Sequence, residues 1–176
     1  FFGAEPMLLA SFFDDQEIVY LSRKEIFSRS RRGPTDLFAL SVLLWGFPTN
    51  QHGVCGHALQ NWENLMEWVG HLRRNREMTL QQLEEMIPHM HNMRGLGIST
   101  FSKYMYFMGC GINGHRCLIL DDRVAKGIWN LTGSEFDDLK AATQNNNHRV
   151  YRNYPAFLEA MENISTTMGV ASKNLA

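Results

Sequence analysis

Lys103 stands in a stretch of the chain that is otherwise apolar and aromatic, which makes it a candidate nucleophile. Phe101, Tyr104 and Phe107 surround it in the sequence. An amine must lose its proton before it can attack an electrophile, and a wall of apolar side chains lowers the pKa of a lysine by removing water. The alternative is that Lys103 extends from a half-buried helix and keeps its ammonium group in solvent.

Two glycines, Gly95 and Gly97, precede this stretch and separate it from an earlier helical pattern. Glycine permits the positive φ that ends a helix, and the absence of a side chain lets a phosphate approach the backbone. The first amides of the following helix have no intrahelical partner and lie at the positive end of the helix dipole. The pattern therefore predicts an anion-binding hairpin, although most turns of this kind only reverse the chain.

The elements that must position these residues are helical along the whole sequence. Strand-like alternation is scarce, so we predict an all-α fold. A capping box at Thr79 predicts the start of one helix, in which Pro88 should cause a kink or a break. The helix that carries the lysine is expected from Ser99 to Met108. Ser134 is expected to begin a second capping box, and Pro155 to be the first residue of the last helix.

The 176 residues, of which 44% are hydrophobic, are enough for one core but hardly for two. The net charge of −1 neither requires nor excludes an anionic partner. Basic side chains are nevertheless clustered, which is compatible with a phosphate-binding face or with a solvated surface. The clusters are Arg23, Lys24, Arg29, Arg31 and Arg32, and Arg73, Arg74 and Arg76.

Three features limit the class of protein. The longest apolar run, residues 37–47, is far shorter than the ~20 residues that span a bilayer, so no membrane location is expected. The three cysteines form no CxxC pair, which favours a reducing compartment, and we expect the cytoplasm. The histidines are scattered along the chain, so we expect no metal site built from side chains.

The stretch MRGLGISTF, residues 93–101, resembles the hairpin of the helix–hairpin–helix (HhH-GPD) DNA glycosylase superfamily. Gly95 and Gly97 match its two glycines, and Leu96 fills the place of its valine or isoleucine. Thr100 matches its threonine, whereas Arg94 stands where the superfamily usually has proline. The resemblance implies that this hairpin binds the DNA backbone, often with a monovalent cation at the backbone of Gly95 and Gly97.

A second segment, ILDDRVAKGI from Ile119, resembles the other half of the superfamily signature. It puts Asp121 at the position of the catalytic aspartate. The carboxylate would stabilise the positive charge that develops on the sugar and orient the nucleophile. Asp121 also suits the N-cap of a helix, and the two roles are compatible. Asp122 is the second choice by adjacency.

In glycosylases that also cleave the strand, a lysine attacks C1′ of the sugar and forms a Schiff base. Its usual position, two residues after the second glycine, is Ser99 here. Lys103 lies one turn further along the same face, ~6 Å away, and from there its side chain could reach the same carbon. The resemblance thus implies Asp121 and Lys103 as the catalytic residues. If Lys103 does not attack, water is the nucleophile.

The resemblance also implies a single domain over residues 1–176, with two helical lobes and the active site in the cleft between them. We expect residues 35–109 to form the lobe that ends in the hairpin, and residues 1–34 with 110–176 to form the other. The expected DNA contacts are Arg94, Gly95, Leu96, Gly97, Ser99, Thr100 and Arg123. The aromatic candidates for stacking on a flipped base are Trp45, Tyr154 and Phe157, and the loop at residues 49–53 is a candidate to probe the duplex.

The function that the resemblance implies is that of a DNA glycosylase, which rotates a modified base out of duplex DNA and cleaves its N-glycosidic bond. Similarity to bacterial 8-oxoguanine-glycosylase-like proteins favours an oxidised purine such as 8-oxoguanine, with AP-lyase activity through Lys103. We expect a monomer that acts at the nucleoid without a cofactor. The alternatives are a glycosylase for a modified or hypermodified pyrimidine of foreign (phage) DNA, a non-catalytic DNA-binding module, and a helical interaction protein.

Overall fold

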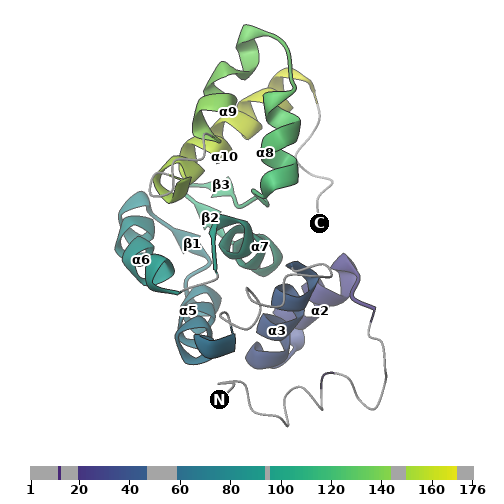
Figure 1. The fold of residues 1–176 in the computed structure, drawn as a ribbon, viewed down its shortest axis with the longest axis vertical. Helices are drawn as coiled ribbons and strands as arrows, with labels where there is room; N and C mark the ends of the chain where they lie inside the picture. Colours follow the sequence, from purple (N-terminus) through teal and green to yellow (C-terminus); the bar gives the residue numbers. More distant parts are fainter. Residues whose placement is uncertain (1–11, 13–19, 47–58, 94–95, 144–149, 170–176) are drawn as a thin grey trace.

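The computed structural model describes residues 12, 20–46, 59–93, 96–143 and 150–169, and helices dominate it (Figure 1). The all-α prediction is confirmed, with one small sheet in addition. The helices are α2 (Arg23–Arg32), α3 (Thr35–Gly46), α5 (Trp62–Arg74), α6 (Leu80–Asn92), α7 (Ile98–Met108), α8 (Asp122–Trp129), α9 (Asp137–Ala142) and α10 (Val150–Thr167), with the 3-10 helix η1 (Ser134–Phe136) before α9. The strands are β1 (Glu77–Met78), β2 (Gly111–Ile112) and β3 (His115–Arg116). Within the described ranges, no helix is long and apolar enough to cross a membrane.

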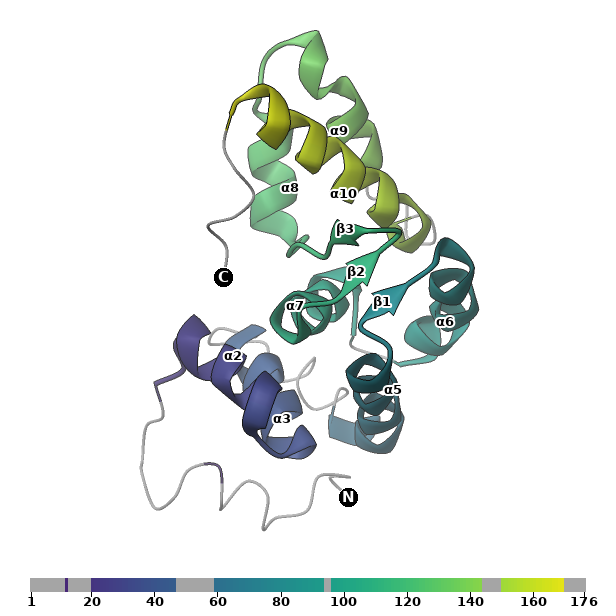
Figure 2. The ribbon, with the colours of Figure 1, turned by 180° about the vertical axis from the view of Figure 1, so that it is seen from behind.

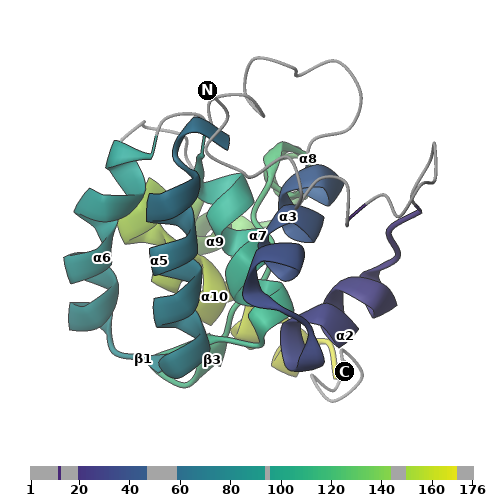
Figure 3. The ribbon, with the colours of Figure 1, turned by 90° about the horizontal axis from the view of Figure 1, so that it is seen from below.

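α7 is the central helix, because its sequence is apolar or aromatic on nearly every face. All its residues from Thr100 to Met108 are buried, and it packs against α2, α3 and α5 (Figure 3). The Tyr104 hydroxyl donates a hydrogen bond to the Ala39 carbonyl of α3 at 2.6 Å. Gly109 ends the helix at φ 72°, a left-handed conformation that glycine adopts without strain. A lysine in the middle of this helix must therefore lie inside the protein or at the wall of a cleft.

A small sheet with the strand order β1–β2–β3 joins two groups of helices. β1 follows α5 and pairs in parallel with β2, so that Glu77 lies opposite Gly111 and Met78 opposite Ile112. β2 and β3 pair in antiparallel fashion, and α10 packs on β3 and on α9. The sheet thus lies between α8, α9 and α10 on one side and α2, α3 and α5 on the other (Figures 1 and 2).

α2 packs against α3 and α7. It belongs to the segment that we expected in the second lobe, yet these main contacts are with the first, and the division into lobes stays a prediction. Arg73 of α5 holds the turn between α2 and α3, because its guanidinium donates hydrogen bonds to Thr35 Oγ1 at 2.6 Å and to the Gly33 carbonyl at 2.7 Å. Arg29 also turns inward and donates to Ser41 Oγ at 2.6 Å.

Two prolines lie inside helices. The sequence predicted a kink or a break at Pro88, where the structure has no break, and its prediction that the last helix begins at Pro155 is wrong. α6 continues through Pro88, and Pro155 lies inside α10, which begins at Val150. A proline removes one backbone hydrogen bond from a helix. Packing of the buried face outweighs this loss, because Met90 in α6 and Tyr154 in α10 are fully buried.

The two capping boxes that the sequence predicted have different outcomes. At the start of α6, the Thr79 side chain accepts from the Gln82 amide and the Gln82 side chain accepts from the Thr79 amide, which confirms the first box. At the second site the prediction is wrong. Ser134 is the first residue of η1 rather than its cap, and Gly133 at the cap position makes no side-chain hydrogen bond.

Candidate active site

Lys103 of α7 and Asp121, the residue before α8, face each other in the structure. The Lys103 Nζ atom lies 3.9 Å from Asp121 Oδ2 and donates a hydrogen bond to Ser99 Oγ at 3.1 Å. The Lys103 side chain is 8% exposed and the Asp121 side chain 26%. The amine is therefore almost enclosed, whereas the carboxylate is open to solvent on one side.

Asp121 is held by its position at the N-cap of α8. Its Oδ1 atom accepts hydrogen bonds from the backbone amides of Arg123 at 3.1 Å and Val124 at 3.0 Å. These bonds satisfy two of the amides that a helix leaves unpaired at its start. Because Oδ1 is engaged in the cap, Oδ2 is the oxygen that faces Lys103. The same carboxylate can therefore cap the helix and face the amine.

The end of α3 supplies the wall beside the lysine. The Lys103 Nζ atom lies 6.0 Å from the centre of the Trp45 ring, within the range of a cation–π interaction. A Cβ atom on Gly46 would lie 3.5 Å from Lys103 Cδ and 3.7 Å from Nζ, so the backbone of Gly46 passes close to the side chain. α3 and the start of α8, which are far apart in the sequence, thus meet at Lys103.

Burial lowers the pKa of Lys103 from its ordinary value. The removal of water from the ammonium group is the main cause, the Asp121 carboxylate acts in the opposite direction, and the Arg123 guanidinium lowers the pKa further. A lower pKa increases the fraction of neutral amine at a given pH, and only the neutral amine can act as a nucleophile. The shift is therefore in the direction that favours covalent chemistry at Nζ.

Ser102 connects the helix of the lysine with the segment of the aspartate. Its hydroxyl is buried, accepts a hydrogen bond from the Leu120 amide at 3.0 Å and donates one to the Ser99 carbonyl at 3.2 Å. Leu120 immediately precedes Asp121 in the chain. This contact therefore fixes α7 against the N-terminal end of α8.

The structure describes only part of the expected hairpin, because Arg94 and Gly95 lie outside the described residues. Gly97 is the N-cap of α7 with φ −114°, so no left-handed conformation requires glycine there. In the part of the chain that the structure describes, a Cβ atom at this position would meet no atom beyond the adjacent residues within 4 Å, which leaves space over the backbone for a ligand. Leu96 and Thr100 are buried, and their side chains belong to the core.

Of the three aromatic residues that we expected to stack on a flipped base, Trp45 is the one that borders Lys103. Tyr154 and Phe157 lie on the buried face of α10 and stack on each other with ring centres 5.9 Å apart. The Tyr154 hydroxyl also donates a hydrogen bond to the Leu118 carbonyl at 2.5 Å. These two rings therefore serve the core, and their positions lend no support to a role in base stacking. The loop at residues 49–53 lies outside the described residues.

Two residues of the site were missed by the sequence analysis. Neither Gly46 nor Ser102 was assigned to the site from the sequence. A glycine that borders a lysine more than fifty positions later, and a serine that bonds to a distant amide, leave no periodic or motif signal in the sequence. They can be assigned to the site only because the structure brings α3, α7 and α8 together.

Among the described residues, no group of three or more His, Cys, Asp or Glu side chains could hold a metal ion. A monovalent cation at the hairpin would be bound by backbone atoms of Gly95 and Gly97. That expectation stays a prediction, because Gly95 lies outside the described ranges.

The fold, in which α6 leads into α7 and α7 carries a lysine that faces an aspartate before α8, is of the helix–hairpin–helix class. A comparison with protein families matches residues 3–175 to the family described as "Putative 8-oxoguanine DNA glycosylase OGG-like protein". The match covers nearly the whole chain, so the chain belongs to this OGG-like family, and the resemblance found in the sequence is confirmed. Membership indicates a DNA glycosylase. Comparisons with curated proteins and with solved structures gave no match.

Proposed function

We propose that this protein excises an oxidised purine such as 8-oxoguanine from duplex DNA and also cleaves the strand, with Lys103 as the nucleophile and Asp121 as the acidic catalyst. The observation that carries the proposal is the distance of 3.9 Å between Lys103 Nζ and Asp121 Oδ2 at an almost enclosed amine. A surface lysine and a helix cap with no further role would not need to meet in this way.

The reaction begins when a base, rotated out of the duplex, brings its C1′ atom next to the pair. The neutral Lys103 amine forms a bond from Nζ to C1′ while the bond from C1′ to the base breaks. The electron pair leaves with the base, which takes up a proton, and the attacking amine becomes positively charged and can supply it. The Asp121 carboxylate stabilises the positive charge that builds up on the sugar in between.

The adduct then opens the sugar ring and becomes an imine between Nζ and C1′. An imine allows loss of a proton from C2′ and elimination of the 3′ phosphate, which is the lyase step. The hydroxyl of Ser99, 3.1 Å from Nζ, holds the amine in place before attack. If water attacks instead of Lys103, the same carboxylate orients the water and the strand stays intact.

The test is to trap the imine with borohydride on a duplex that contains 8-oxoguanine. We expect the wild-type protein and Lys126→Ala, which changes an exposed lysine of α8, to form a covalent adduct. Lys103→Gln should form none. Base release without an adduct would show a monofunctional enzyme, and an adduct in Lys103→Gln would overturn the assignment of the nucleophile.

The identity of the excised base is determined by incubating the protein with duplexes that carry different modified bases and analysing the released base by mass spectrometry. A modified or hypermodified pyrimidine of foreign DNA is the alternative substrate, and a module that binds DNA without excision is the alternative from another class. Salt-dependent binding without release of any base would favour the module.

We further propose that the protein acts as a monomer on DNA in the cytoplasm and needs no cofactor.

A further inference from the structure

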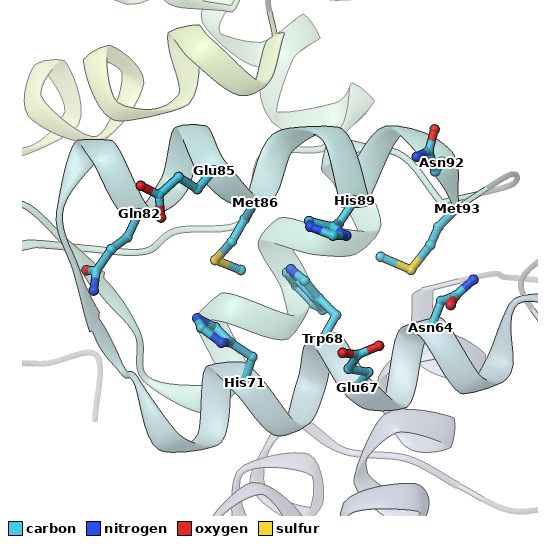
Figure 4. Close-up of a pocket in the computed structure, with 10 residues that line it drawn as sticks. All are labelled: Asn64, Glu67, Trp68, His71, Gln82, Glu85, Met86, His89, Asn92 and Met93. Carbon is cyan, nitrogen blue, oxygen red and sulfur yellow. The ribbon is translucent and has the colours of Figure 1, made fainter.

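A cavity of about 430 Å³ lies between α5 and α6 (Figure 4). This volume falls in the range of small-molecule sites, ~300–1,000 Å³. Trp68 of α5, Met86 of α6 and Met93, which directly follows α6, line it with buried side chains. Glu67 and Glu85 border it from the two helices and are exposed. The other described residues that line it are polar: Asn64, His71, Gln82, His89 and Asn92. The cavity therefore combines a small apolar floor with many polar groups, a composition that suits a small, partly polar organic molecule.

This cavity is separate from the lysine site. The Trp68 ring packs edge-on against Phe101, with ring centres 4.7 Å apart, and against Tyr104 at 5.8 Å. Successive residues of an α-helix are turned by about 100°, so Phe101, two residues before Lys103, points to nearly the opposite side of α7. A ligand in the cavity therefore lies behind α7 and cannot react at Lys103. The inference below does not rest on the proposed glycosylase activity.

The indole N–H of Trp68 has no hydrogen-bond partner, and within the described residues it is the one buried side-chain polar atom of which this is true. The residue is 5% exposed, and Figure 4 shows the indole nitrogen turned into the space between the two helices. A buried donor without an acceptor is unfavourable. Because an indole can only donate, a ligand that satisfies it must present an acceptor.

The charges around the cavity restrict the ligand further. Glu67 and Glu85 can only accept hydrogen bonds when ionised, so the ligand must also carry donors. None of the described residues that line the cavity is lysine or arginine, although the imidazoles of His71 and His89 line it as well. The two carboxylates repel a phosphate. The thioethers of Met86 and Met93, next to the indole, form a polarizable surface on which a flat ring packs well.

We propose that this cavity binds a planar nitrogen heterocycle that carries a hydrogen-bond acceptor beside an N–H donor, as a free nucleobase or nucleoside does, and that it excludes the phosphorylated forms. The acceptor pairs with the Trp68 indole N–H, and the donor pairs with a carboxylate of the rim.

Inosine is a suitable probe, because its base has a carbonyl group next to a ring N–H. The protein contains four tryptophans, so a ¹H–¹⁵N spectrum of the indole groups shows four signals, and the signal that is lost in Trp68→Phe identifies Trp68. We expect inosine to shift the Trp68 signal alone to lower field. The affinity, measured by calorimetry, should fall about tenfold in Trp68→Phe.

Trp62→Phe is the matched control, since Trp62 is buried on the same helix but does not line the cavity. It should bind inosine as the wild type does. Trp68→Phe removes an unpaired donor and keeps a ring, so its Tm should be unchanged or higher. Glu67→Gln changes an exposed residue at the rim of the cavity and leaves the core undisturbed. This variant should also bind inosine more weakly.

Ligand variants complete the test and do not depend on folding of a mutant. 1-Methylinosine, which lacks the ring N–H, should bind at least about fivefold more weakly than inosine, and inosine 5′-monophosphate should bind more weakly still. The proposal is overturned if inosine leaves the Trp68 signal unmoved at millimolar concentration. It is also overturned if Trp68→Phe binds inosine as well as the wild type, or if the monophosphate binds as tightly as the nucleoside.

Discussion

The hydroxyl of Ser102 accepts a hydrogen bond from the backbone amide of Leu120 at 3.0 Å, and this bond ties the helix of Lys103 to the residue before Asp121. The bond is fully buried and spans eighteen positions of the chain. It fixes the backbone that carries Lys103 against the backbone that carries Asp121, the two residues that we propose to be catalytic. The predictions for Ser102, Asp121 and the pKa of Lys103 concern this geometry.

Ser102→Ala should destabilise the protein and misplace the pair. The change leaves the Leu120 amide buried without its acceptor, which costs about 1–3 kcal/mol of unfolding free energy. A shift of the aspartate segment by a fraction of an ångström should lower the excision rate by about 10- to 100-fold. The measurement is single-turnover base release together with denaturant unfolding.

Ser41→Ala separates the two effects of that change. Ser41 is also fully buried and bonded, in its case to Arg29 and to the Leu37 carbonyl, but it lies away from the pair. We expect a comparable loss of stability with an excision rate near that of the wild type. Equal losses of rate in the two variants would mean that Ser102 acts only through stability.

Asp121→Asn should keep the fold and lose the chemistry. Asparagine caps a helix as well as aspartate does, so the cap itself should contribute less than about 0.5 kcal/mol to any change in the unfolding free energy. Asp121→Ala, in contrast, should lose about 1 kcal/mol with the cap. Both variants should bind damaged duplex, and both should release base at least about 100-fold more slowly. Undiminished excision by Asp121→Asn would exclude the carboxylate as catalyst.

The lowered pKa of Lys103 predicts the pH dependence of adduct formation. The trapped adduct should form faster as the pH rises and should level off below 10.5, the ordinary pKa of a lysine. Asp121 raises the pKa and Arg123 lowers it. The NMR titration of Lys103 Cε should therefore move to lower pH in Asp121→Asn and to higher pH in Arg123→Ala. Shifts in the same direction in both variants would refute this account of the site.

The same pKa has a consequence for stability. Between the lowered folded pKa of Lys103 and 10.5, the unfolded chain binds more protons at this residue than the folded protein does. The contribution of Lys103 to the unfolding free energy therefore rises with pH in that window and is least favourable below it. Lys103→Met should be more stable than the wild type at neutral pH, and the difference should narrow as the pH approaches 10.5. Thermal unfolding at a series of pH values measures it.

Gly97→Val should weaken DNA binding without harm to packing. Among the described residues, no atom outside the adjacent residues lies within 4 Å of a Cβ atom at this position, so these residues leave room for the new side chain. It would occupy the space in which we expect a DNA phosphate, and affinity for duplexes of any sequence should fall about tenfold or more. Gly127→Val, at an equally open glycine of α8, is the control and should bind normally. A loss of affinity for duplexes of one sequence only would argue against contact with the DNA backbone.

Local signals in the sequence predicted the helices well where the deciding forces are local. The capping box at Thr79 involves residues three apart, and the structure has both of its hydrogen bonds. Pro155 misled the prediction of a helix start, and a break was one of the two outcomes predicted at Pro88, because a proline removes a backbone hydrogen bond from a helix. Whether a helix survives that loss depends on the burial of its other face, here of Met90 and Tyr154.

The site shows the same division between local and distant information. The spacing of Ser99 and Lys103 on one helix face was predictable, and the structure has the bond between them at 3.1 Å. The approach of Lys103 to Asp121 was expected from the resemblance to a family and not from any pattern in the chain. The positions of Trp45 and Gly46 beside the lysine follow from how α3 crosses α7, which no short stretch of sequence encodes.

The inward-facing guanidinium groups of Arg29 and Arg73 affect how binding to DNA depends on ionic strength. Each phosphate that a protein neutralises changes the slope of log K against log salt by about −0.9, because counterions leave the DNA. Arg29 and Arg73 instead bond to hydroxyl and carbonyl oxygens at the α2–α3 turn and displace no counterions there. The number of ions released on binding is therefore smaller than a count of the basic residues in the two clusters would give.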